Sequence, residues 1–523
     1  MDYEAKLSPL AKKYIRAIGM DYAEAEGKMI AVDRVVSEVA GFYEKIRSAM
    51  EYQEEEVVLR SSIERILRRR LLFDDTGERI AEPLIRELAW AKYFANNKFP
   101  EILISKISKK INLYIQLKRE VRKRHAKVKK ETLDDWILQI MSADIAFTIN
   151  PRLDMQHISN FMFHVIYKKI KITDDLENKD PLIFLNIKRA IAKEDKAFLR
   201  YELFVQYFGQ LTEHNIEDVA DEFKQGYKQI EGIFNHPLNE RILSYIKRQA
   251  VPFVILADVC YLHKENIHEL FSDEKLGAAI SSVCKKRYAQ INSKTRRAII
   301  RSIIFLFVTK ALFALFVEGV VERFIYGHLF IKSLTLNTIM PPAIMFLILF
   351  FVKTPGRENT AKITERIKSI LFEDEVSAID EKVFTVREKR NTFLYTIFIF
   401  LWLVAFVTGV WLIHTVLSAL EIDVISQGVF LFFLIVVSFL AYRINMAANT
   451  YNIVEERENF KTVLFNFLFM PFIHLGRRLT LSFSRLNVFL IIFDFVIETP
   501  FKTVFSFMEQ WFFFLRGERE KLG

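Results

Sequence analysis

Apolar and polar positions divide this chain near residue 297. Beyond that point, four apolar segments approach or exceed the length of about 20 residues that a helix needs to cross a bilayer. They cover approximately residues 298–320, 329–352, 392–417 and 425–442. Before that point, apolar residues recur every three or four positions, as at Val39, Tyr43 and Ile46, which is the spacing of one helix face. The pattern predicts an all-α protein with a large cytoplasmic helical domain, a four-helix transmembrane region and amphipathic C-terminal helices.

This division, with proline positions and charge density, predicts six regions along the 523 residues. In order they are a charged helical N-terminal region, a helical cytoplasmic domain, a first transmembrane hairpin, a cytoplasmic basic loop, a second transmembrane hairpin and an interfacial amphipathic tail. Their expected bounds are residues 1–133, 134–296, 297–352, 353–391, 392–442 and 443–523.

Lysine and arginine indicate how the apolar segments are oriented. They gather before the first segment, between the second and third, and after the fourth, whereas residues 418–423 contain neither. Connections rich in Lys and Arg stay on the cytoplasmic side of a membrane. We therefore expect both termini and the N-terminal domain to be cytoplasmic.

The tail contains a candidate interfacial helix over residues 501–515. Its apolar positions follow the i, i+3, i+4, i+7 series of one helix face and include Trp511, with Lys502 and Glu509 opposite and Arg516 just after. Aromatic residues on one face and cations at the end favour the lipid interface. The alternative is that this face packs on the chain's own spans.

The densest charge run lies at residues 118–130 and holds eight cations. Contact with anionic lipid head groups is one interpretation, and a solvated helix face is the other. We do not expect nucleic acid as a partner, because no aromatic platform or nucleic-acid-binding motif accompanies the run. The eight residues are Lys118, Arg119, Arg122, Lys123, Arg124, Lys127, Lys129 and Lys130.

Polar residues at unusual depth mark the first hairpin: Lys310, Glu318, Glu322 and Asn337, followed by Pro341-Pro342. An unpaired ammonium at mid-membrane costs about 2.5 to 3.5 kcal/mol, so Lys310 should face protein or water. Glu318 lies eight residues on, about 12 Å along a straight α-helix, and we expect no direct pair between the two. A buried cation near a broken helix favours a transport site. Alternatively, Lys310 snorkels and the prolines only bend the helix.

No local motif for catalysis or for nucleotide binding occurs. No two glycines are closer than six positions, which excludes a P-loop, a dinucleotide fingerprint and a G-x-S-x-G elbow. We expect no cofactor. His157 with His164, and Glu265 with His268, have spacings seen in metal sites, but we interpret them as surface or capping residues. The two cysteines, Cys260 and Cys284, suit a reducing cytosol.

Several segments resemble uncharacterised multi-pass membrane proteins of bacteria. These are FVTKALFALFVEG and LNTIMPPAIMFLI in the first hairpin, the loop start KTPGREN, LRYELF at 199–204 and SRLNVF at 484–489. The resemblance implies a bacterial inner membrane. It implies no activity, substrate or site residue.

Three functions are compatible with these patterns. We favour a non-enzymatic, membrane-anchored scaffold that binds an unknown protein partner through its cytoplasmic domain, which makes up more than half of the chain. The alternative is a small oligomeric transporter or channel that uses Lys310, Glu318 and Asn337. A membrane-bound enzyme ranks third, because its catalytic residues need no local motif.

Overall fold

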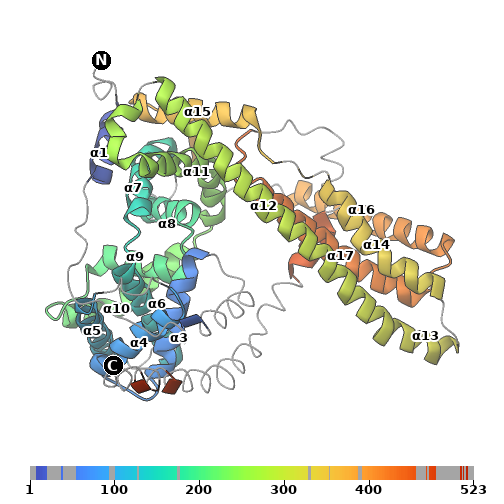
Figure 1. Cartoon of the computed structure of the whole chain (residues 1–523), viewed down its shortest axis with the longest axis horizontal. Helices are drawn as coiled ribbons and strands as arrows, with labels where there is room; N and C mark the ends of the chain where they lie inside the picture. Colours follow the sequence, from blue (N-terminus) through green and yellow to red (C-terminus); the bar gives the residue numbers. More distant parts are fainter. Residues whose placement is uncertain are drawn as a thin grey trace. The chain divides into compact units, whose positions relative to one another are not determined.

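The computed structural model is almost entirely helical, which confirms the all-α prediction (Figure 1). The residues it describes are 7–19, 37–38, 55–93, 100–125, 129–173, 177–271, 273–327, 331–350, 352, 354–386, 392–454, 467, 470–478, 507–508, 511 and 514–515. By their contacts, residues 1–271, 367–386 and 491–523 form unit 1, and residues 272–366 and 387–490 form unit 2.

The first core of unit 1 forms around Trp136. Its indole is 2% exposed and lies edge-on to Phe223 and Tyr227, with ring centroids 5.3 and 5.5 Å away. Apolar faces of six helices converge on this core, and Leu185 from the helix at residues 179–191 joins them. The helices are α3 (Glu55–Arg70), α4 (Gly77–Trp90), α5 (Ile102–Arg124), α6 (Lys130–Ile149), α9 (Lys196–Phe208) and α10 (Ile216–Phe234).

These packing partners differ from the expected division at residue 133. That boundary falls inside α6, which packs on α3 and α5 before it and on α9 after it. Charge density changes there, but the buried face of α6 does not end, since Leu133, Trp136 and Ile137 are all nearly inaccessible. Residues on both sides of the boundary therefore belong to one core.

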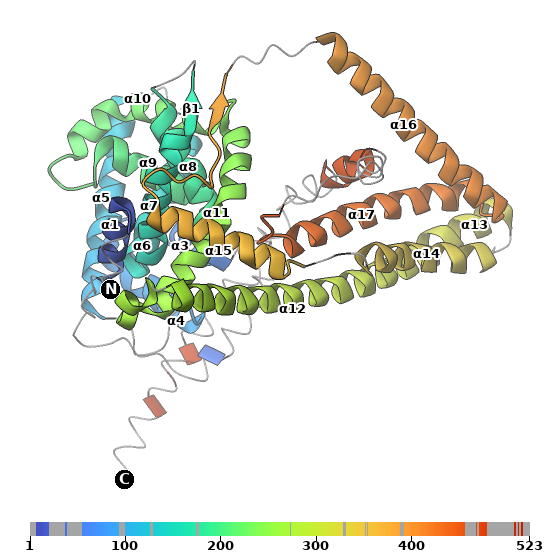
Figure 2. The ribbon, with the colours of Figure 1, turned by 90° about the horizontal axis from the view of Figure 1, so that it is seen from above.

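A second group of helices in unit 1 packs around α11. Its members are α1 (Pro9–Gly19), α7 (Leu153–Lys169), α8 (Lys179–Ile191), α11 (Asn239–Leu262) and a 3-10 helix (Lys264–Phe271). At the end of α7 the chain extends into β1 (Ile170–Ile172). This strand pairs in parallel with β2 (Lys382–Phe384), as Figure 2 shows. In the chain, β2 follows the first two apolar helices.

The connection expected only as a basic loop, residues 353–391, is therefore partly built into unit 1. It contains α15 (Arg357–Phe372) and β2, and backbone atoms near both accept or donate hydrogen bonds across the unit. Ser8 N donates to Leu371 O at 2.8 Å, and the Tyr245 hydroxyl donates to Asp380 O at 2.6 Å. The sequence pattern of this connection did not predict these contacts.

Unit 2 contains the apolar helices. They are α12 (Asp273–Phe313), a π-helix (Ala314–Glu318), α13 (Gly319–Tyr326), α14 (Ile331–Phe350), α16 (Thr392–Ala419) and α17 (Val424–Ala448). Helices α12, α14 and α17 pack on one another through Leu306, Met345 and Val437. The three helices are drawn in Figures 1 and 2. Helix α12 continues through residue 297, so the change from polar to apolar residues occurs within one helix.

Three helices of the described part are long and apolar enough to cross a membrane: Glu274–Phe324, Phe393–Ala419 and Val424–Ala448. The expected count of four is wrong by this criterion. The missing member is α14, whose apolar part is the 16-residue segment Leu334–Leu349.

Candidate functional site

The four polar residues of the first hairpin meet in one cluster inside unit 2. Lys310 comes from α12, Glu318 from the end of the π-helix, Glu322 from α13 and Asn337 from α14, and each has no exposed surface. A fifth fully buried residue, Ser426 of α17, completes the cluster. Sequence reasoning did not identify Ser426, because a serine near a helix start is ordinary.

Lys310 and Glu318 form a direct ion pair, which corrects the expectation that they lie too far apart. The Lys310 Nζ donates a hydrogen bond to Glu318 Oε1. The expectation assumed a straight α-helix, whereas Ala314–Glu318 is a π-helix. Its i to i+5 hydrogen bonds enclose more residues per turn and shorten the rise per residue, so the two long side chains meet. Lys310 Nζ also lies 5.2 Å from the ring centroid of Phe433, a cation–π contact.

Asn337 connects this pair to α17. Its Nδ2 donates to Glu318 Oε2 at 3.1 Å and to the backbone oxygen of Ser426 at 3.0 Å. Ser426 Oγ in turn donates to Glu322 Oε1 at 3.3 Å. Because both neighbours of Nδ2 are acceptors, they fix the orientation of the amide. The cluster therefore joins all three packed helices.

Fixing the amide leaves one atom of the cluster unsatisfied. The Asn337 Oδ1 is buried and has no hydrogen-bond partner among the described residues. A buried acceptor without a donor costs about 1 to 3 kcal/mol. The atom therefore suits a ligand that brings a hydrogen-bond donor or a positive charge.

Further polar groups lie next to the cluster at the start of α17. Asp423 caps this helix, accepting hydrogen bonds from Ile425 N and Ser426 N, both at 3.1 Å. The Gln427 Nε2 donates to Ser418 Oγ at 3.1 Å and to Ile422 O at 2.7 Å. Polar groups thus extend from the buried cluster to the last turn of α16, where Ser418 is exposed.

Comparisons with protein-family models, with curated proteins and with solved structures gave no match to this chain. Within the described residues, no group of three or more His, Cys, Asp and Glu side chains is placed to hold a metal ion.

The basic run of residues 118–130 is largely paired within unit 1. Each of its five cations on α5 lies within 4 Å of a carboxylate; Arg122, for example, donates to Asp134 at 2.7 Å, and Arg124 lies 3.1 Å from Asp221. Lys129 and Lys130 are exposed, and Lys127 lies outside the described residues. These ion pairs favour the helix-face interpretation over a lipid site.

Most of the expected interfacial helix at 501–515 also lies outside the described residues. Those described have helical backbone, and the side chains of Phe507, Trp511 and Phe514 are 66%, 51% and 59% exposed. Trp511 lies between the two phenylalanines, with ring centroids 6.5 and 6.2 Å away. Exposed aromatic rings are compatible with an interfacial position, which stays a prediction.

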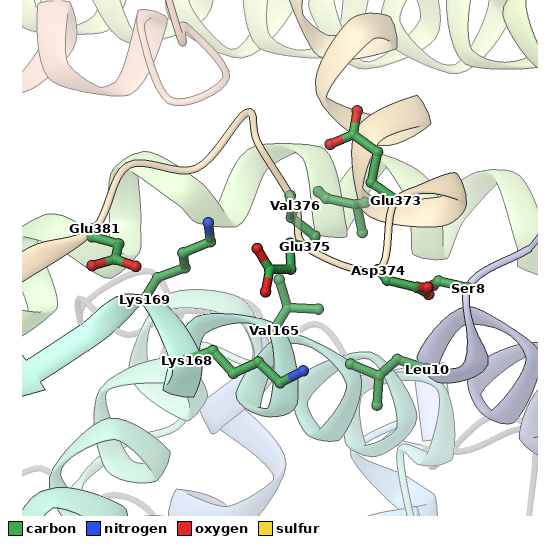
Figure 3. A pocket seen from close by; sticks show the side chains of 11 residues that line it. Ser8, Leu10, Val165, Lys168, Lys169, Glu373, Asp374, Glu375, Val376 and Glu381 are labelled. Atoms are coloured by element: carbon green, nitrogen blue, oxygen red, sulfur yellow. The ribbon is translucent and has the colours of Figure 1, made fainter.

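A small cavity in unit 1, of about 160 Å³, lies where the segment after α15 meets α1 and α7 (Figure 3). Lys168 and Lys169 line it opposite the acidic loop residues Glu373, Asp374 and Glu375. The positive charge of Lys169 contributes to lowering the pKa of Glu373, after hydrogen bonds from Ser369 and Ser377. The cavity therefore lies in the contact between this segment and the rest of unit 1.

Unit 1 also buries two carboxylates around one lysine. Lys188 Nζ lies 2.5 Å from Glu202 Oε1 and 3.8 Å from Glu194 Oε1, and the side chains of Lys188 and Glu194 are each 3% exposed. Burial raises the pKa of Glu194 well above its ordinary value, and the nearby Glu202 carboxylate raises it further. The ionised form of Glu194 is therefore unfavourable in the folded state.

The substitution Glu194→Gln should make the stability of unit 1 less sensitive to a rise in pH from about 4 to about 8. A raised carboxyl pKa favours folding at pH values below the unfolded pKa of about 4.3, and this contribution is lost as pH rises through the folded pKa. Thermal melts between roughly pH 4 and pH 8 should show the wild-type Tm falling relative to that of the variant. The control is Glu240→Gln, at a glutamate whose side chain is 78% exposed. Wild-type and Glu194→Gln curves that stay parallel would contradict this assignment.

Proposed function

We propose that the protein is a non-enzymatic transport protein of a bacterial inner membrane, which moves a proton or a small cation through the buried cluster. The observation that carries this proposal is the fully buried Lys310–Glu318 pair inside the most strongly packed apolar helices. Ionisable residues at membrane depth are rare and by default indicate a functional site. Apolar side chains at these positions would avoid the desolvation cost of the pair.

The ligand class follows from the acceptors of the cluster. Glu318 and Glu322 supply carboxylate oxygens, and Asn337 supplies an amide oxygen that has no donor among the described residues. Such oxygens bind hard cations or accept a proton. An anion would face two carboxylates, so the cluster is suited to a positive charge.

Transport requires a second conformation, because all five side chains of the cluster are sealed from solvent. We place the change at the π-helix, where the hydrogen-bond ladder of the first span is locally rearranged. Single π-turns inside α-helices are frequent at functional sites. A shift of this turn back to α-geometry would separate Lys310 from Glu318 and open the pair.

The pairing of β1 with β2 supports a hairpin of two crossings for α12 and α14. These strands belong to one sheet, so both lie on the same side of any membrane, and the chain must cross an even number of times between them. The 16-residue segment Leu334–Leu349 of α14 spans about 24 Å against a hydrocarbon core of about 30 Å. Local thinning of the bilayer accommodates such a short helix. We therefore propose four crossings.

The distribution of Lys and Arg supports an orientation with both termini in the cytoplasm. Cysteine labelling tests this orientation together with the four crossings. A membrane-impermeant maleimide should label Ser418→Cys in intact cells and Ser377→Cys only after permeabilisation. Both positions are exposed, and the natural Cys260 and Cys284 are buried and serve as unreactive background. The reverse pattern would contradict the proposed topology, and labelling of both from one side would contradict the second hairpin.

The transport function itself is tested with the purified full chain in liposomes. A potassium diffusion potential should drive protein-dependent uptake of protons, read by an internal pH dye, or of sodium, read by a sodium dye. The two arms distinguish the two cations. Liposomes with protein that behave like empty liposomes in both arms would refute the transport proposal.

A second candidate, the membrane-anchored scaffold, is favoured by the way unit 1 incorporates residues 367–386. The chain enters the first hairpin from unit 1 and returns to it before α16, so unit 1 is attached on both sides of α12–α15. Cross-linking in intact cells followed by purification should then recover one stoichiometric protein attached to unit 1. Recovery of such a partner, with no flux in the liposomes, would favour the scaffold.

A further inference from the structure

A second cavity in unit 1 contains polar side chains that have no partner among the described residues. It has a volume of about 410 Å³ and lies where α1, α7, α11 and the 3-10 helix come together. The buried residues Tyr14 and Ala257 line its inner part, whereas Asn150, Asp154 and Tyr261 are exposed and line its opening. Pockets that hold small organic ligands measure about 300 to 1,000 Å³, so this cavity has room for one.

The side chain of Tyr14 is packed in place, but its hydroxyl has no acceptor or donor. The residue is 4% exposed, and its ring stacks on that of Phe161 with centroids 4.9 Å apart and planes inclined by 9°. Among the described residues, none forms a hydrogen bond with this hydroxyl. Buried polar groups in folded proteins are almost always hydrogen-bonded. Because Tyr14 lines the cavity, a bound molecule would supply the missing partner.

Arg152 has an unfavourable backbone conformation beside the same cavity. Its φ and ψ are both 47°, in the left-handed region that residues with a Cβ rarely adopt. Its guanidinium forms no hydrogen bond and no ion pair within 4 Å in the described part of the chain, and its charge acts on the buried Glu194 only from a greater distance. Backbone strain of this kind clusters at ligand sites, where the surrounding structure maintains it.

The first turn of α7 adds backbone donors at the same place. Arg152 is the N-cap of this helix, and its side chain makes no capping hydrogen bond. The first amides of a helix have no acceptor within the helix, and its N-terminal end carries a partial positive charge. All residues from Asn150 to Asp154 line the cavity, so this positive end lies beside it.

Charge and chemistry define the kind of ligand. Arg152 and Lys264 bring two positive charges, whereas Asp154 is the one acidic residue among the described residues that line the cavity. An anionic group is therefore favoured beside Arg152 and the start of α7. Asp154 accepts hydrogen bonds from hydroxyl groups, and the apolar Ile18 and Leu153 suit a carbon skeleton.

We infer that this cavity binds a small organic anion that also carries hydroxyl groups. Its phosphate or carboxylate contacts Arg152 and the first turn of α7, and its hydroxyl groups bind Tyr14 and Asp154. The site lies entirely within unit 1 and does not depend on transport through the Lys310–Glu318 pair, so the two proposals can fail separately.

Calorimetric titration of the full chain in detergent tests the inference with defined probes. Ribose 5-phosphate and gluconate carry hydroxyl groups together with a phosphate or a carboxylate, and neutral ribose carries hydroxyl groups alone. At least one of the two anions should bind with a Kd of about 1 mM or below, and comparison of the two shows which anionic group fits. If neither anion binds more tightly than ribose, the inference is wrong.

Two variants test the contacts without disturbing the fold. Arg152→Asn introduces a residue that adopts the left-handed conformation more readily, so the ligand-free Tm should be kept or raised. Its affinity for the anion should fall at least about tenfold, because a charged hydrogen bond is lost. Tyr14→Phe keeps the stacking on Phe161 and should lower the affinity about fivefold.

The matched control is Arg79→Asn, at an arginine whose side chain is 76% exposed and does not line the cavity. It should bind the anion like the wild type. Unchanged affinity in Arg152→Asn or in Tyr14→Phe would place the anion elsewhere and overturn the inference. An equal loss in Arg152→Asn and Arg79→Asn would also overturn it, because total charge alone would then account for the binding.

Discussion

Replacing Lys310 with methionine is expected to lower the Tm of unit 2 by roughly 10 °C. The variant leaves Glu318 buried without its cation, and breaking a buried ion pair in this way costs about 3 kcal/mol or more. Methionine itself would be favourable in an apolar helix, so the loss comes from the uncompensated carboxylate. Thermal melts of the purified chain in detergent measure the effect.

A double substitution separates the two contributions. Lys310→Met combined with Glu318→Leu removes both charges and should recover most of the lost stability, because well-packed apolar residues often match or exceed a buried pair. Lys285→Met, at an exposed lysine of the same helix, should leave the Tm unchanged. A stable Lys310→Met protein would mean that the ammonium reaches water and that the pair is dispensable.

The second large effect is expected in unit 1 from Asp144→Ala. The Asp144 carboxylate accepts hydrogen bonds from Lys110, from the Tyr114 hydroxyl at 3.1 Å and from the Tyr201 hydroxyl at 2.8 Å. Removing it leaves a lysine and two hydroxyls without their acceptor, at a cost of about 3 kcal/mol. The three partners come from α5 and α9, on both sides of the boundary expected at residue 133.

Hydrogen exchange shows whether these helices form one cooperative unit. In Asp144→Ala, amides of α5 and α9 should lose protection together. Asp221→Ala, at an aspartate whose side chain is 67% exposed, should change stability by less than about 0.5 kcal/mol. If the amides of α5 kept their wild-type protection in Asp144→Ala while those of α9 lost theirs, the result would instead support two separate domains.

Much of the architecture could be predicted from hydrophobic periodicity. The change from a polar to an apolar half and the all-α fold follow from residue patterns that are local in sequence. The count of membrane-length helices did not, because α14 contributes only the apolar segment Leu334–Leu349 within the described residues. The pairing of β1 with β2 also could not be predicted, since three residues at a helix end carry no strand pattern.

The candidate site was predictable by residue type but not by geometry. Lys310, Glu318, Glu322 and Asn337 stand out because polar groups are rare in apolar segments. Their mutual contact depends on the π-helix, and nothing in the letters Ala314–Glu318 indicates an extra residue in that turn. Likewise, the partners of the basic run lie on other helices, at Asp75, Asp134 and Asp221, so its sequence alone suggests an unpaired cationic surface.

Flux through Glu318→Gln tests the central claim most directly. Glutamine keeps the size of the side chain and its hydrogen bonding but removes the charge that pairs with Lys310 and the oxygen that takes up a proton or a cation. In liposomes that show wild-type uptake, Glu318→Gln should reduce uptake to the level of empty liposomes while inserting normally. Glu358→Gln, at an exposed glutamate of α15, should transport like the wild type. Undiminished uptake through Glu318→Gln would contradict a path through the buried cluster.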